Sequence, residues 1–160
     1  MKKLILLLTV LMLLSTTMAS AEQPYYEQID SPQTFAYGVS GWVKNGNSTI
    51  SNKNFTFAWI EITNENYRSE VLDCLKSEVR WDCYVEYDAF HTNHSGVANI
   101  WIKEPKDNIT EDFVRNNLVN AILVEKGYAR VIRSQSPSKY ESYLLKFQDE
   151  AQKNKRGIWK

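Results

Sequence analysis

Two pairs of side chains in this sequence have the chemistry to bind a metal or to form a covalent link: Cys74 with Cys83, and His91 with His94. In an oxidising compartment an even number of cysteines favours a disulfide. The alternative is two buried free thiols. A structural zinc site needs four ligands, and neither cysteine has a histidine close to it in the sequence. Since the N-terminus is typical of an exported chain, we expect a Cys74–Cys83 disulfide.

The two histidines lie in a polar stretch between two strand-like segments, which is typical of a hairpin turn. Two imidazoles without an evident third ligand make a poor metal site, so we expect an exposed turn. The five tryptophans and nine tyrosines could stack on bases or sugars. At alternating strand positions, however, aromatic side chains more often belong to the core, and we expect most of them there.

The first residues are typical of a secretory signal peptide. Lys2 and Lys3 supply positive charge, and an uninterrupted apolar run follows from Leu4 to Leu14. That run is too short to span a bilayer. Ala19-Ser20-Ala21 is a small-residue cleavage site. We therefore expect cleavage after Ala21, a secreted or periplasmic mature protein, and no membrane-spanning segment.

Hydrophobic periodicity predicts a β-rich α+β domain. Period-two alternation and turn residues predict strands over residues 33–43, 49–51, 55–62, 81–87 and 96–102. Three- and four-residue spacing predicts helices over residues 69–79, from Thr110 to Gly127, and from Ser138 to Gly157. The two glycines mark the helix ends because glycine adopts the left-handed conformation most easily. A short β-type run at 128–133 separates the last two helices.

The most specific pattern lies in the last part of the chain. Residues 119–131 read VNAILVEKGYARV, and the helix that follows ends in Gly157-Ile158-Trp159. This pattern resembles the staphylococcal-nuclease-like (thermonuclease) family, whose members carry V-N-x-x-L-V-x-x-G-x-A and then a basic helix ending in G/N-[IL]-W. The resemblance implies a five-stranded OB-type barrel with three helices, in the order β-β-β-α-β-β-α-α. It implies a domain over residues 35–160, after an N-terminal extension at 22–34.

The resemblance also implies where a nuclease site would lie. A family nuclease holds calcium with anionic oxygens, activates water with a carboxylate and binds phosphate with two arginines. The matching positions here are uncharged: Asn45, Asn47, Thr63 and Asn64 for the metal, and Ala58, Asn66 and Ser95 for catalysis. At an effective dielectric near 20, each lost charge pair at 4 Å forgoes about 4 kcal/mol. Glu65 is a weak candidate for the catalytic carboxylate, after a one-residue shift of the alignment.

The charges are distributed unevenly along the chain. Residues 22–117 hold eight basic and fifteen acidic side chains, a net charge of −7. From Leu118 onward there are nine basic and four acidic side chains, a net charge of +5. A nucleic-acid groove on the barrel would need positive charge, since phosphate contacts supply most of the affinity. We expect weak, non-specific binding of nucleic acid at most.

These patterns together predict an exported thermonuclease-like protein that does not cleave nucleic acid and acts as a binding or interaction module. We expect a monomer that binds a protein or another ligand and needs no cofactor. The alternative is an active, metal-dependent nuclease that hydrolyses DNA or RNA at a displaced site, in which case it would use calcium. A third interpretation is oligosaccharide or peptide binding on the barrel face.

Overall fold

The computed structural model describes residues 26–160 except 36–37, 46–47, 80–81, 88–95 and 134–137. Five strands form a closed barrel, in the order β1 (Tyr26–Phe35), β2 (Gly38–Asn45), β3 (Ser48–Phe57), β6 (Val97–Trp101) and β5 (Asp82–Tyr87). Neighbouring strands are antiparallel except β3 and β6, whose parallel pairing includes Phe57 opposite Ala98. The predicted five-stranded OB-type barrel is confirmed.

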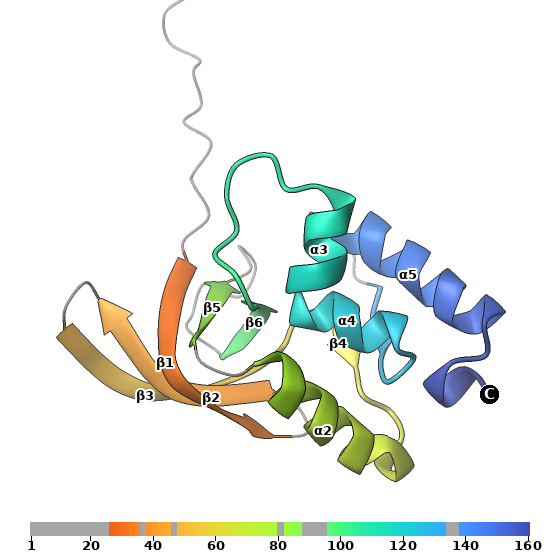
Figure 1. The fold of residues 1–160 in the computed structure, drawn as a ribbon, viewed down its shortest axis with the longest axis horizontal. Coiled ribbons are helices and arrows are strands. Elements are labelled where there is room, and N and C mark those ends of the chain that lie inside the picture. Colours follow the sequence, from red (N-terminus) through yellow and green to blue (C-terminus); the bar gives the residue numbers. More distant parts are fainter. Residues whose placement is uncertain (1–25, 36–37, 46–47, 80–81, 88–95, 134–137) are drawn as a thin grey trace, which may run out of the picture.

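The helices cover the barrel on one side and below it (Figure 1). They are α2 (Arg68–Glu78), α3 (Glu111–Asn117), α4 (Val119–Glu125) and α5 (Glu141–Lys153), with 3₁₀ turns η1 (Glu65–Tyr67) and η3 (Gly157–Trp159). Every residue of α4 from Val119 to Val124 is buried. A helix that is apolar on all sides must be enclosed by other elements, and α4 lies between the barrel, α2, α3 and α5.

The barrel core follows from period-two alternation, because successive strand residues point to opposite faces. Each of the five strands contributes fully buried residues to the core, for example Ile29, Val39, Phe55, Cys83 and Ile100. Thr56, between the buried Phe55 and Phe57, is exposed. The sequence therefore specifies which face of each strand turns inward.

The first hairpin differs from the prediction. The single strand expected over residues 33–43 is two antiparallel strands: β1 ends at Phe35 and β2 begins at Gly38, and these two residues pair with each other. Alternation could not reveal the reversal, because both strands of a hairpin turn their apolar residues into the same barrel. Most of the expected extension at 22–34 is in fact the first strand, since β1 begins at Tyr26. The expected signal peptide at 1–21 lies outside the described residues.

The helix expected from Thr110 to Gly127 is interrupted at Leu118. This residue is extended (φ −87°, ψ 110°) and pairs with Trp101 at the end of β6. The amide of Ile102 donates to the Asn117 carbonyl at 2.8 Å. Contacts to the barrel therefore override a helical pattern that is continuous in the sequence, which divides the helix into α3 and α4.

The strand expected over residues 55–62 is also divided. Trp59 has a positive φ of 65°, so the chain turns out of the barrel after β3. It then forms β4 (Ile60–Glu61), which pairs with β7 (Arg130–Val131). The predicted β-type run at 128–133 is thereby confirmed.

The C-terminus folds back onto the end of α4. Ile158 donates its amide to the Gly127 carbonyl at 2.8 Å. A Cβ on Gly127 would lie 2.3 Å from the Arg156 carbonyl oxygen, so only glycine permits this approach. Within the described part of the chain, no helix has the length and apolar composition needed to cross a bilayer.

Candidate functional site

The position that the sequence comparison assigned to a phosphate-binding arginine is closed to any ligand. Ala58 is fully buried. Its amide donates to the Ala98 carbonyl at 2.8 Å, and its carbonyl accepts from Asn120 Nδ2 at 2.9 Å. An arginine here would place its charge inside the core, which favours a different alignment of this strand, while the match of Ala58 stays a prediction.

The exposed residue at this end of β3 is Thr56, two positions earlier. Moving the family pattern by the same two residues replaces Ala58, Thr63 and Asn66 with Thr56, Glu61 and Asn64. In this register the arginine position is Thr56, which points outward between the buried Phe55 and Phe57, as the alternation of side chains along a strand requires. The burial pattern therefore favours Glu61, which the sequence comparison missed, as the acidic residue that follows the third strand.

Glu61 is an exposed carboxylate on β4 with a strong partner. It lies opposite Arg130 of β7, and its Oε2 accepts hydrogen bonds from Arg130 Nε at 2.9 Å and Nη2 at 2.7 Å. Charge-assisted contacts of this kind are among the stronger hydrogen bonds in proteins. The negative charge that could hold a cation is thus balanced within the protein.

The loop after β4 uses its polar side chains for local structure. Asn64 Oδ1 accepts from the Asn66 amide at 2.9 Å and so caps the η1 turn. Glu65, the weak catalytic candidate, is exposed and lies 3.5 Å from Arg68. Thr63 is exposed as well. Across the described residues, no three His, Cys, Asp or Glu side chains gather closely enough to hold a metal ion.

The turn at Asn45 belongs to the second hairpin, between β2 and β3, and not to the turn after the first strand. The structure describes only the backbone of Asn45, and Asn47, Ser95, His91 and His94 lie outside the described residues. The turn that does follow the first strand reads Phe35-Ala36-Tyr37-Gly38 in the sequence. It contains no carboxylate, so the shifted register gives no metal ligand there either.

The predicted disulfide is absent from the structure. Cys74 on α2 and Cys83 on β5 are free thiols, and both are buried. Burial raises the pKa of the Cys74 thiol, although the nearby Lys126 opposes the effect. Burial, with a smaller contribution from Asp82, raises the pKa of Cys83 to about 12. The two thiols are therefore protonated core residues, because desolvation disfavours the thiolate.

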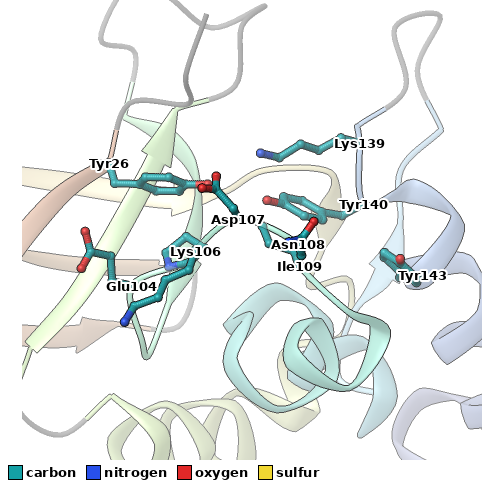
Figure 2. Close-up of a pocket in the computed structure, with 10 residues that line it drawn as sticks. Tyr26, Glu104, Lys106, Asp107, Asn108, Ile109, Lys139, Tyr140 and Tyr143 are labelled. Atoms are coloured by element: carbon teal, nitrogen blue, oxygen red, sulfur yellow. The ribbon is translucent and has the colours of Figure 1, made fainter. Parts of the chain in front are cut away.

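A cavity of about 860 Å³ opens where the start of β1, the loop 104–109 and the entry to α5 meet. Figure 2 shows Tyr26 and Lys139 extending toward each other across it, with Asp107 and Tyr140 between them. Its lining residues are Tyr26, Glu104, Pro105, Lys106, Asp107, Asn108, Ile109, Lys139, Tyr140 and Tyr143. Its size is in the range of small-molecule sites, roughly 300–1,000 Å³.

A buried carboxylate organises one wall of this cavity. Glu86 on β5 is only 3% exposed. Its Oε2 accepts from Trp101 Nε1 at 3.1 Å and from the Tyr140 hydroxyl at 3.0 Å, and it forms an ion pair with Lys139. A buried charge needs such partners, because desolvation without them is costly. The four side chains are called the Glu86 cluster below.

Two tyrosines at the cavity, Tyr26 and Tyr140, lie close to the carboxylate of Glu86. Burial and the negative charge of Glu86 raise the pKa of Tyr26 to about 12 and raise the pKa of Tyr140 as well. The Tyr140 ring packs edge-to-face against Trp101, with centroids 5.2 Å apart at 73°. Both contacts restrain the Tyr140 ring before any ligand arrives. The sequence patterns did not predict this cavity.

The chain was compared with models of known protein families. The model of a protein family described as staphylococcal nuclease homologue matches residues 26–160. The match begins at the first residue of β1 and so includes the complete barrel and all the helices described above. No curated protein matches the chain.

Proposed function

The chain belongs to the family of staphylococcal nuclease homologues, and on that basis we propose that it is a non-catalytic member that binds a ligand through the nuclease-type fold. The fold by itself does not carry the activity. The activity needs several anionic oxygens and cationic side chains at one place, and the described residues do not supply them together.

The observation that carries this proposal is the pairing of Glu61 with Arg130. In the register shifted by two residues Glu61 is the acidic residue that follows the third strand, and its Oε2 accepts hydrogen bonds from Arg130 at 2.7 and 2.9 Å. To bind a divalent ion through Oε2, Glu61 would have to give up both hydrogen bonds from Arg130, and no carboxylate of the first turn would assist it. A single carboxylate is a weak ligand set for calcium, which takes six to eight oxygens.

The same residue supports one competing function, an active metal-dependent nuclease. Glu61 is exposed, with 47% of its side-chain surface accessible, so a ligand can reach it. If Arg130 released Glu61 and turned to a phosphate, the pair could serve as metal ligand and phosphate contact. This function would require further ligands from residues outside the described ranges.

A digestion assay separates the two functions. The chain beginning at Glu22 is incubated with single- and double-stranded DNA and with RNA, in calcium, magnesium or chelator. We expect no cleavage above the buffer background. Metal-dependent cleavage that disappears in E61Q but persists in the matched variant E65Q would establish the nuclease instead, because Glu65 is the neighbouring exposed carboxylate.

We also propose that the protein acts outside the cytoplasm. The support is the pattern of Lys2, Lys3, the apolar run and Ala19-Ser20-Ala21. Mass spectrometry of the protein recovered from the culture medium or the periplasm should give Glu22 as the first residue. An intact Met1 in the exported fraction, or recovery only from the cytoplasm, would contradict export.

A further inference from the structure

We propose that the cavity between β1, the loop 104–109 and the entry to α5 binds a neutral saccharide, with Tyr26 and Tyr143 as stacking surfaces and Asp107 and Asn108 as hydrogen-bonding groups. This inference rests on the proposed ligand-binding function and names its site and ligand class. None of the residues that line the cavity is at a position matched to the nuclease site.

The charges lining the cavity argue against an ionic ligand. The lining holds two carboxylates, Glu104 and Asp107, and two ammonium groups, those of Lys106 and Lys139. Lys139 forms an ion pair with Glu86, and its ammonium lies 4.9 Å from the centre of the Tyr140 ring. Lys139 is therefore not free for a phosphate, and Tyr140 does not offer a free aromatic face to a ligand cation. The other cation of the lining, Lys106, is outnumbered by the carboxylates Glu104 and Asp107. A neutral ligand avoids both problems.

The remaining groups fit a polyhydroxylated ring. Tyr26 and Tyr143 are half-buried, and both line the cavity. Asp107 and Asn108 are exposed at the cavity. A carboxylate accepts two hydrogen bonds or more, and an amide both donates and accepts. Sugars combine apolar C–H faces with many hydroxyls, so this mixture of aromatic and planar polar groups matches their chemistry.

The site is rigid before a ligand binds. The Glu86 cluster restrains Tyr140, which is only 2% exposed and forms the wall behind the ligand space. In the opposite loop Asn108 has a positive φ of 64°, and Thr110 caps α3 by accepting from the Phe113 amide at 3.2 Å. Backbone strain of this kind often occurs at ligand sites, and preorganisation lowers the entropy lost on binding.

Calorimetric titration of the chain beginning at Glu22 tests the proposal. The probes are neutral di- to tetrasaccharides of glucose, galactose, mannose and N-acetylglucosamine in α- and β-linkage, and in a second arm soluble polymers of the same sugars. Charged probes are a glucuronate disaccharide, the deacetylated form of chitobiose and a trinucleotide. We expect saturable binding of at least one neutral sugar and weaker binding of its charged analogue. Binding to the oligosaccharides would indicate a free sugar as the ligand, whereas binding only to the polymers would indicate a glycan chain.

Variants locate the site. Y143A should weaken binding about five- to tenfold, as expected for the loss of one aromatic contact, whereas Y143F should bind like the unmodified chain. D107A, in an exposed loop, should also weaken binding, and it remains informative if Y143A fails to fold. The matched control is Y128A, since Tyr128 packs against Tyr67 away from the cavity.

Three outcomes would overturn the inference: no neutral sugar binds in either arm, a charged probe binds more tightly, or Y143A and D107A leave binding unchanged. Each of these leaves the proposed loss of catalysis intact. Conversely, nucleic-acid cleavage dependent on Glu61 would remove the proposed function without deciding whether the cavity binds sugars.

Discussion

At the scale of single residues, Glu86 is the side chain whose surroundings most restrict its replacement. It is a buried charge that joins β5 to the end of β6 through Trp101 and to the entry of α5 through Tyr140 and Lys139. A satisfied buried charge does not by itself make a protein more stable than an apolar residue would. Removing one partner, however, leaves the other buried groups unpaired, and the resulting loss of stability is large.

We expect E86L to lower the free energy of unfolding by about 2–5 kcal/mol, because the Trp101 Nε1–H and the Tyr140 hydroxyl lose a buried acceptor. Y140F removes one donor and should cost less, about 1–2 kcal/mol. Urea unfolding followed by fluorescence measures both. The exposed E65Q should change stability by less than about 0.5 kcal/mol. Equal effects of E86L and E65Q would show that the Glu86 cluster contributes nothing.

The two thiols provide a second prediction at this scale. Because burial raises the pKa of Cys83 to about 12, almost no thiolate exists at Cys83 at neutral pH. The native protein should react slowly with Ellman's reagent at pH 8, and reactivity at Cys83 should rise only as the pH approaches that value. In denaturant without reductant two thiols should react promptly. No reactive thiol in denaturant would show that the cysteines are joined, as the sequence predicted.

At the scale of elements, α4 holds the barrel and the other helices together through one polar residue. Asn120 is fully buried. Its Nδ2 donates to the Ala58 carbonyl at 2.9 Å, and its Oδ1 accepts from the Ile100 amide at 3.1 Å. The Asn120 side chain thus hydrogen-bonds two backbone groups: the Ala58 carbonyl, just after β3 where the chain leaves the barrel, and the Ile100 amide in β6.

Replacing Asn120 with leucine should lower the free energy of unfolding by about 2–4 kcal/mol, because two buried backbone groups then lack partners. The matched variant N116L changes an exposed asparagine on α3 and should alter stability by less than about 0.5 kcal/mol. Chemical denaturation of both variants makes the comparison. If N120L were as stable as the unmodified protein, the link between α4 and the barrel would be unimportant.

The helices on this side are also joined by Arg115. From α3 its guanidinium contacts Glu125 at 2.6 Å and Glu150 at 2.8 Å, and it lies 4.2 Å from the centre of the Phe147 ring. We expect R115L to cost about 1–3 kcal/mol, since several contacts of a partly buried cation are lost together. R130L breaks the more exposed Glu61 pair and should cost about 0–1 kcal/mol. The reverse ranking in thermal unfolding would contradict this account.

At the scale of the whole molecule, the charge distribution opposes nucleic-acid binding on the barrel. The part of the chain that contains all five barrel strands, residues 22–117, carries a net charge of −7, and residues 118–160 carry +5. Several positive charges of the second part are committed to ion pairs, among them Arg130 with Glu61 and Lys139 with Glu86. Few cations therefore remain to contact phosphates.

Single-stranded DNA should accordingly bind no tighter than about 10⁻⁵ M near physiological salt, and more weakly as salt rises. Fluorescence anisotropy with a labelled oligonucleotide across a range of salt concentrations measures this affinity. Submicromolar binding that persisted at high salt would indicate base stacking on aromatic side chains, and nucleic acid would then replace the saccharide as the expected ligand.

The sequence by itself determined a β-rich α+β domain, the helical C-terminal part and the glycine stops at Gly127 and Gly157, because these follow from local periodicity and from backbone conformations that only glycine adopts easily. The closed barrel was implied by the resemblance to the staphylococcal-nuclease-like family. Only the tertiary structure decided the turn after β1, the break at Leu118 and the exposure of Thr56 in place of Ala58. In each case a contact between distant strands or helices outweighs the local pattern. The Glu86 cluster and the cavity beside it were equally invisible in the sequence, since they unite β1, β5, β6 and the entry to α5 from widely separated parts of the chain.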